Sequence, residues 1–401
     1  MTFVAGAPLR DASHLSAWAR DLRPSALQHA LAGAADPEVL SLSLGLPDPE
    51  LFPVDAFAEA SARALGRHRN VLQYGLPCER LKRQICAHMA QRGVDCSPDR
   101  IFLTGGAQQG MHLLAGLLLD RRSAVLEEEL TYPGFQQAID RYDPDIITIP
   151  CTTREGLVVE AVERAFARVP RPALLYIMTD GHNPLGVSLD LEKRRRLALL
   201  AREYHVPICE DDAYGFLCYE EARLPPVRAA EDEWVYYIGS FAKVLAPSLR
   251  VGWLVVPPDL MRPLSVLKEA WDINTSSYTQ WMLAEYLDTG ALPAHIQSLC
   301  VAYRAKRDAM HAALCAAMPP GCRWTLPSNG VFVWIDLPDG VDASALLNEA
   351  IQRERVAFLP AEAFSRGRRR NGMRLNFSHC TIAEIAEAVA RIGRMLRFAM
   401  A

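Results

Sequence analysis

The sequence predicts an α/β fold with a mostly parallel sheet covered by helices, together with a smaller α+β domain. Three observations predict it. Short apolar, β-branched runs alternate with longer helical patterns between about residues 100 and 256. Polar or glycine-rich clusters directly follow several of these runs. After about residue 290 the pattern changes to helices mixed with short strands, which is typical of an α+β domain.

In the first region the apolar runs predict strands and the longer stretches predict helices. Strands are expected at 101–103, 124–126, 146–149, 174–178, 206–209, 235–238 and 251–256. A buried helix is expected at 108–119, and an amphipathic one at 191–204 with Arg194 on its polar face. Strands separated by helices favour parallel pairing, because a parallel connection needs a long crossover.

The second region predicts a long helix at 294–318 followed by shorter elements. These are a strand at 330–335, a helix at 343–354, strands at 356–359 and 373–377, and a helix at 382–395. The first fifty residues are expected to pack with this smaller domain. We therefore expect an N-terminal arm over 1–50, a large domain over 51–290 and a small domain over 291–401.

The composition excludes several classes of protein. The chain has 401 residues, of which 50% are hydrophobic and 22% charged, so it has ample material for a core and disorder is not expected. Its 43 basic and 47 acidic residues leave a formal charge of −4, which does not favour a nucleic-acid partner. No stretch approaches the roughly 18–20 apolar residues of a membrane helix, so no membrane association is expected.

The cysteines and the N-terminus indicate where the protein works. The ten cysteines are scattered and none forms a C-x-x-C pair, so neither a metal site nor a redox motif is expected. Charged residues interrupt the first twenty positions, which is not typical of a signal peptide. Both observations favour a cytoplasmic protein with reduced thiols.

The chemically informative clusters all follow predicted strands, where α/β sheets bind their ligands. Thr104-Gly105-Gly106-Ala107-Gln108 joins a strand to a helix, where free backbone N–H groups favour a phosphate. The other clusters are Asn183-Pro184-Leu185-Gly186, Asp211-Asp212-Ala213-Tyr214, Ser240-Phe241-Ala242-Lys243 and Arg250. A phosphate site, an amide, a carboxylate, a phenol and a lysine are the groups that bind pyridoxal phosphate as a Schiff base.

In their order along the chain these motifs resemble the aspartate-aminotransferase-fold enzymes, fold type I of the pyridoxal-phosphate superfamily. Within it, the sequence is most similar to the 2-aminoadipate/kynurenine-type aminotransferases and to the aminotransferase half of MocR regulators. The resemblance implies a fold type I large domain and amino-group transfer between an L-amino acid and a 2-oxo acid, in biosynthetic amino acid metabolism. It rests on Tyr74, residues 105–108, Tyr132, Asn183, Asp211, Tyr214, Ser240, Lys243, Arg250 and Arg374.

The resemblance implies catalytic roles for three of these residues. Lys243 is expected to form the internal aldimine with pyridoxal 5'-phosphate and to shuttle the proton at the substrate's α-carbon. Asp211 is expected to pair with the pyridinium nitrogen; Asp212 beside it is an alternative, but the D-x-x-Y spacing favours Asp211. Tyr132 is expected to stack on the cofactor ring. The further implied cofactor contacts are Asn183 and Tyr214 to the phenolic oxygen, and Gly106, Ala107, Gln108, Ser240 and Arg250 to the phosphate.

The resemblance also implies how the substrate and a second subunit are bound. Arg374 is expected to hold the substrate's α-carboxylate in a bidentate fork, with a structural salt bridge as the alternative. Gly45 and Asn183 are expected to lie against the substrate. Tyr74 occupies the position that such enzymes lend to the neighbouring subunit's phosphate, which implies a homodimer with shared active sites.

Several positions near the substrate depart from the family pattern. Leu44 and Asn329 stand where glycine is usual, and His182 precedes Asn183 as either a satisfied polar residue or an extra acid/base group. Residues 25–28 lack an arginine that some relatives carry, so an acidic substrate such as 2-aminoadipate is not expected. These departures keep a second function open: decarboxylation, elimination, cyclisation or oxidative deamination of an amino acid on the same scaffold. A MocR-type regulator is not expected, because forty residues before Ser41 are too few for its winged-helix domain.

Overall fold

The computed structural model describes residues 13–20, 36, 38–220 and 223–400, and these form two compact units. The large unit comprises Pro47–Ala305 and Thr325–Val331, and the small unit comprises the described residues up to Leu46, Lys306–Trp324 and Phe332 onward. The division falls inside helix α11 (Leu292–Ala317), whereas the sequence predicted a boundary before this helix, at 290. The stretch 25–28, on which the expectation about acidic substrates rests, lies outside the described residues.

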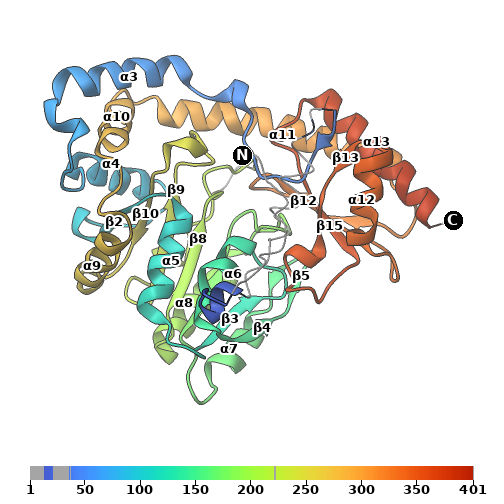
Figure 1. Cartoon of the computed structure of the whole chain (residues 1–401), viewed down its shortest axis with the longest axis horizontal. Helices are drawn as coiled ribbons and strands as arrows, with labels where there is room; N and C mark the ends of the chain where they lie inside the picture. Colours follow the sequence, from blue (N-terminus) through green and yellow to red (C-terminus); the bar gives the residue numbers. More distant parts are fainter. Residues whose placement is uncertain (1–12, 21–35, 37, 221–222, 401) are drawn as a thin grey trace. The chain divides into compact units, whose positions relative to one another are not determined.

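A seven-stranded sheet forms the centre of the large unit (Figure 1). In spatial order its strands are β2 (Ile101–Thr104), β10 (Gly252–Val255), β9 (Val235–Ser240), β8 (Ile208–Asp212), β7 (Leu174–Ile177), β3 (Ala124–Glu128) and β4 (Asp145–Ile149). Only β10 runs antiparallel to its neighbours, so the predicted mostly parallel sheet is confirmed. The connection 241–251 before β10 contains no crossover helix, so the chain turns back beside β9.

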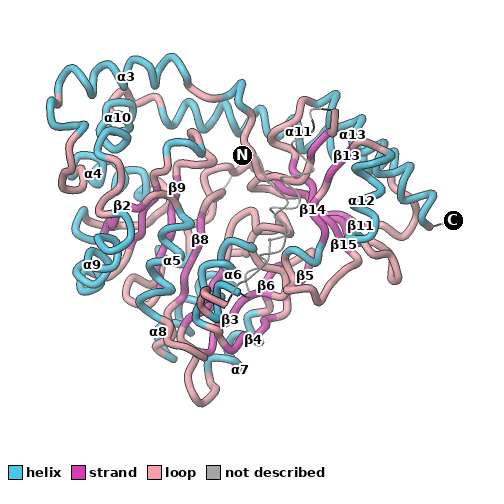
Figure 2. The backbone as a smooth tube through the Cα atoms, in the orientation of Figure 1, coloured by secondary structure: helices cyan, strands magenta, loops and turns pink. Residues whose placement is uncertain are grey.

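Helices cover both faces of this sheet (Figures 1 and 2). Ile238 of β9 packs against Gly110 of α5 (Ala107–Leu118). Val235 of the same strand belongs instead to the core cluster of α7 (Val159–Phe166) and α8 (Leu191–Tyr204). Because side chains alternate along a strand, these two residues point to opposite faces. One face therefore carries α5, and the other carries α7 and α8.

A buried carboxylate joins three of the remaining helices of the large unit. The remaining helices include α3 (Val54–Arg67), α4 (Glu79–Ala90), α9 (Met261–Asp272) and α10 (Ser277–Leu287), with the short α6 (Pro133–Ile139) between β3 and β4. Glu285 of α10 accepts from Arg67 of α3 at 3.0 Å. It also accepts at 2.8 Å from Arg80, the second residue of α4. These contacts tie three helices together at one point.

The small unit is built on an antiparallel sheet in the order β11-β12-β15-β14. These strands are β11 (Arg323–Trp324), β12 (Phe332–Asp336), β15 (Gly372–Asn376) and β14 (Leu359–Pro360), and the helices are α12 (Ala343–Arg353) and α13 (Ile382–Ala399). The prediction of one strand at 356–359 is wrong. Instead β13 (Val356–Ala357) pairs with β1 (Leu40–Ser41), and β14 pairs with β15, because the chain changes partners at Phe358.

Candidate active site

The glycine loop, Ser240 and the carboxylates of β8 lie at one edge of the sheet in the large unit. The carboxyl ends of β2, β9, β8 and β7 lie there, together with the amino end of the reversed strand β10. Gly252 pairs with Thr104 on one side and with Ser240 on the other, and Asp212 pairs with Gly239. Since paired strands lie about 4.8 Å apart, the glycine loop, Ser240 and the β8 carboxylates are neighbours.

The glycine loop is closed by an arginine. Gly106 precedes α5 with φ +100°, and Arg250 Nη2 donates to the carbonyl of Gly105 at 2.7 Å. A Cβ on Gly106 would lie only 2.8 Å from Arg250 Nη2, so the guanidinium packs directly on this backbone. The free N–H groups of a 12-residue helix and an exposed guanidinium therefore meet at one point. This arrangement suits a phosphate.

Gln108 and Tyr132 lie side by side next to this loop. Gln108 Nε2 donates to the carbonyl of Gly134 at 2.6 Å. The half-buried ring of Tyr132 packs so closely on Gly134 that a Cβ there would overlap it. On the neighbouring strand end, Ser240 Oγ accepts from the N–H of Ala242 at 3.1 Å, and the half-buried Lys243 follows.

The two adjacent carboxylates that end β8 have different surroundings. Residues 208, 210 and 212 face α7 and α8, so Asp211 faces the side of α5 and Asp212 the opposite side. Asp212 accepts from Arg92 Nη1 at 2.9 Å, from the Tyr237 hydroxyl at 3.0 Å and from the N–H of Gly215 at 2.6 Å. Its hydrogen-bonding capacity is therefore used within the protein.

Asp211, in contrast, has one oxygen left over. Its Oδ2 accepts from the Tyr176 hydroxyl at 2.8 Å, but Oδ1 has no hydrogen-bond partner among the described residues. Burial raises the pKa of Asp211 to about 7; the Tyr176 hydrogen bond lowers this pKa, Asp212 raises it and the positive charge of Lys243 lowers it. A buried acceptor of this kind would be satisfied by a ligand N–H group.

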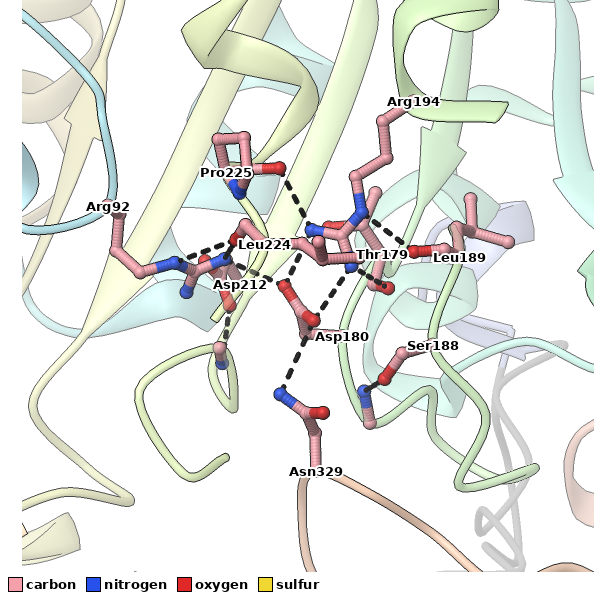
Figure 3. A network of polar contacts seen from close by, with 12 residues as sticks. Arg92, Thr179, Asp180, Ser188, Leu189, Arg194, Asp212, Leu224, Pro225 and Asn329 are labelled. Carbon is pink, nitrogen blue, oxygen red and sulfur yellow. Dashed lines mark hydrogen bonds and ion pairs between the residues drawn. The ribbon is translucent and has the colours of Figure 1, made fainter. Parts of the chain in front are cut away.

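A buried ion network lies beneath this edge (Figure 3). Asp180 accepts from Arg194 at 2.8 and 2.9 Å, from Arg92 Nη2 at 2.8 Å and from Asn329 Nδ2 at 3.4 Å. Burial raises the pKa of Asp180, but the two guanidinium groups outweigh it and lower this pKa overall. Arg194 is buried here, so its predicted place on a polar helix face is wrong.

His182 has partners for both ring nitrogens. Its Nε2 lies 2.9 Å from Glu128 Oε2, and its Nδ1 accepts from the N–H of Leu185 at 3.3 Å. The carbonyl of His182 also accepts from Gly186 at 2.6 Å. These contacts hold the turn that carries Asn183, which favours the interpretation of His182 as a satisfied polar residue.

The two predicted substrate residues of the small unit share one aromatic neighbour. The guanidinium of Arg374 lies 4.0 Å from the ring centre of Phe332, and its Nη2 donates to the carbonyl of Ser43. A Cβ on Gly45 would lie 2.7 Å from Phe332 Cζ, so a larger residue cannot replace Gly45 without moving this ring. Both residues are thus held against the first residue of β12.

Comparisons with known proteins identify the family. The family model described as aminotransferase class I and II matches residues 37–392. The chain belongs to this family. It is therefore an enzyme that transfers amino groups, and the fold that the resemblance implied is confirmed.

Known aminotransferases match almost the whole chain. The 2-aminoadipate transaminase of Thermus thermophilus is 36% identical over 94% of this chain and 94% of its own length. The aromatic-amino-acid aminotransferase 1 of Thermococcus litoralis is 33% identical over 96% and 94%. The crystal structure of Pyrococcus horikoshii kynurenine aminotransferase, in complex with PMP, superposes with a TM-score of 0.91 at 32% identity, covering 97% and 98% of the two chains.

Four residues around the edge of this aminotransferase's sheet were not indicated by sequence reasoning. They are Glu128, Tyr176, Asp180 and Arg92, and all four are buried. Glu128 ends an apolar strand and Asp180 lies three residues after another, and a carboxylate at a strand end is the signal that indicated Asp211. Tyr176 and Arg92 gave no such signal, because an aromatic residue within a strand and an arginine after a helix are ordinary in themselves.

Proposed function

We propose that this aminotransferase uses pyridoxal 5'-phosphate, bound covalently by Lys243, to move an amino group between an L-amino acid and a 2-oxo acid. The observation that carries this proposal is Asp211. A 3% exposed carboxylate with an unpartnered Oδ1 among the described residues fits the N–H of a protonated pyridine ring. Asp212 does not fit, because its oxygens already accept three hydrogen bonds.

The glycine loop fits the phosphate of the same cofactor. The N–H groups of Gly106, Ala107 and Gln108 would bind its oxygens, together with Ser240 Oγ and the guanidinium of Arg250. A side chain at residue 106 would fill this space, since its Cβ would lie 2.8 Å from Arg250 Nη2. The anion and the ring nitrogen therefore have separate, complementary partners on the same sheet edge.

The chain's residues divide the work of the reaction. When bound, the cofactor delocalises the electron pair that remains on the substrate's α-carbon after deprotonation. Lys243 Nζ moves that proton, and Asp211 holds the proton on the ring nitrogen. The further proposed roles are Tyr132 against the ring, Asn183 and Tyr214 at the phenolic oxygen, and Arg374, Asn183 and Gly45 at the substrate.

We further infer a homodimer with shared sites. Tyr74 is 73% exposed, and Leu72 and Leu76 on either side of it are 76% and 90% exposed. Large apolar side chains gathered on one segment favour a protein partner, and a second copy is the partner that the Tyr74 motif implies.

We also infer a cytoplasmic location in biosynthetic metabolism: all ten cysteines are free, and no helix in the described part of the chain has the length and hydropathy to cross a membrane.

The proposed reaction is tested on the holoenzyme with a panel of amino acids. The panel includes aromatic amino acids, kynurenine and 2-aminoadipate, which the relatives' names suggest. We expect the absorbance of the bound cofactor to change with the productive donors, and mass spectrometry to find the matching 2-oxo acid. Release of carbon dioxide or ammonia without pyridoxamine phosphate would instead indicate the alternative chemistry on this scaffold.

Shared sites are tested by mixing K243A with the larger truncation Y74A, after each variant alone is shown to lack activity. If Tyr74 serves the partner's site, each hybrid dimer has one site with both defects and one with neither. Random exchange then restores about a quarter of wild-type activity, since half of the dimers are hybrids with one intact site of two. If Tyr74 serves its own subunit, every hybrid site keeps one defect and mixing restores nothing.

A further inference from the structure

Tyr176 connects the middle of the sheet to the carboxylate assigned to the cofactor. It lies on β7, which pairs in parallel with β8 so that Tyr176 is opposite Cys209. Residues 175 and 177 face α8, so Tyr176 points to the other side, as Asp211 does. Its buried hydroxyl donates to Asp211 Oδ2 at 2.8 Å.

A stacked ring fixes the direction of this phenol. Phe135 of α6 lies parallel to Tyr176, with 4.0 Å between ring centres and 6° between planes. Phe135 comes three residues after Tyr132, the residue assigned to the cofactor ring. The start of one short helix therefore positions both rings: Tyr132, its N-cap, for the cofactor, and Phe135, within the helix, against Tyr176.

We propose that Tyr176 is a positioning residue: its hydroxyl occupies Oδ2 of Asp211 and so keeps Oδ1 available for the ring nitrogen of the cofactor. This inference rests on the proposed function. A carboxylate bound at neither oxygen can rotate or take up a proton itself. The donor on Oδ2 restricts both possibilities, because it fixes the carboxylate plane and favours the ionised form.

The charges around the pair support this role. The titratable groups that act on Asp211 are Tyr176, Asp212 and Lys243, and those that act on Tyr176 are Asp211, Tyr132 and Glu128. Burial and the negative charges of Asp211 and Glu128 raise the pKa of Tyr176 well above its usual value, so it stays a donor over the working range of pH. Its hydrogen bond lowers the pKa of Asp211, which burial alone would raise further.

The fold supplies a matched control for Tyr176. Tyr237 is equally buried on β9, and its hydroxyl donates to Asp212 Oδ2 at 3.0 Å on the opposite face of the sheet. Each tyrosine thus gives one hydrogen bond to one of two adjacent carboxylates. Substitution by phenylalanine removes the same group from each, but only Tyr176 acts on the carboxylate with an unpartnered oxygen.

The test compares Y176F and Y237F holoenzymes with the wild type. The readouts are the absorbance of bound cofactor from pH 5 to 10, the cofactor dissociation constant, kcat, and thermal unfolding of the apoprotein. In Y176F we expect the spectroscopic transition to shift by about one pH unit, cofactor affinity to fall about tenfold and kcat to fall by a similar factor. In Y237F we expect a wild-type spectrum and affinity.

Each other outcome overturns the inference in a recognisable way. If the wild type binds cofactor and transfers amino groups but Y176F keeps its spectrum and affinity, the positioning role is wrong and the proposed function stands. If both variants shift the spectrum equally, the effect is general loosening of the sheet and the role is again wrong. If the wild type takes up no pyridoxal phosphate, the proposed function fails and this inference fails with it.

Discussion

Asp211 and Asp212 are consecutive in β8, yet their carboxylates lie on opposite faces of the sheet and accept from different tyrosines. Tyr176 donates to Asp211 and Tyr237 donates to Asp212. Arg92 lies at Asp212, whereas Asp211 keeps an unpartnered oxygen among the described residues. Asp212 therefore stabilises the fold, whereas Asp211 has an oxygen available to bind a ligand.

This difference predicts opposite effects of two matched substitutions. In D211N, kcat should fall by about a hundredfold or more, because an amide cannot keep the ring nitrogen protonated. The apoprotein should unfold at the same or a higher temperature, since the variant avoids burying a charge with a raised pKa. Steady-state kinetics and thermal unfolding of the apoprotein measure the two effects.

D212N is the variant to compare with D211N. The substitution leaves the buried guanidinium of Arg92 with one carboxylate fewer, at a cost of about 3–5 kcal/mol in the free energy of unfolding. Denaturant unfolding should show this loss, and a cofactor-specific defect in D212N with a stable fold would contradict our assignment of the two residues.

The covalent attachment to Lys243 predicts a specific chemical result. Borohydride reduction of the wild-type holoenzyme should leave the cofactor's mass on the peptide that contains Lys243. K243A should bind the cofactor without this adduct and lose turnover. K193A is the control, because Lys193 donates to the carbonyl of Glu155 at 2.7 Å, away from the glycine loop; this variant should keep both the adduct and activity.

The glycine loop predicts that G106A weakens cofactor binding. The new Cβ would displace Arg250, and φ +100° disfavours any side chain, so the dissociation constant for pyridoxal phosphate should rise at least about tenfold. G290A separates strain from displacement, because Gly290 also has a positive φ of +71° but no atom within 4 Å of its Cβ. It should lose about 1 kcal/mol of stability with unchanged cofactor binding; equal cofactor loss in both variants would contradict the phosphate assignment.

The buried His88 should make the free energy of unfolding depend on pH. It is buried, stacks on Phe216 at 3.7 Å, and has no partner for either ring nitrogen among the described residues. Burial, with a smaller effect of the Arg92 and Arg223 charges, lowers the pKa of His88 from 6.5 to about 3. Between these values the unfolded chain binds a proton that the folded protein does not, so stability is lost as pH falls.

The expected loss from His88 is up to about 1.4 kcal/mol per pH unit below pH 6.5. H88F keeps the stacked ring and removes the titration, so its unfolding free energy should decline less steeply between pH 6.5 and 4. Denaturant unfolding at several pH values measures both slopes, and above pH 7.5 the two slopes should agree. Parallel curves over the whole range would show that His88 does not titrate in this window.

Local sequence patterns predicted the secondary structure correctly where the interactions that form an element are close in sequence. Alternating apolar runs and helices predicted the parallel sheet, since strand and helix periodicities are properties of short segments. The helix predicted at 191–204 matches α8, whose Asp190 caps the N–H of Lys193 at 2.8 Å. Local pattern failed at 356–359, which divides between two sheets, because Val356 and Ala357 pair with β1 more than 300 residues earlier in the chain, whereas Leu359 and Pro360 pair with β15.

By itself, the sequence determined the family, the order of the elements and the motifs at the strand ends. Only the tertiary structure decided which side chains are satisfied. Arg194 is buried because Asp180 meets it. Of the two adjacent carboxylates, Asp211 alone keeps an unpartnered oxygen in the described part of the chain, because Arg92 and the N–H of Gly215 donate to Asp212 and not to Asp211. The physical reason is that a buried polar group is stable only with partners, and those partners come from strands and helices that sequence distance does not reveal.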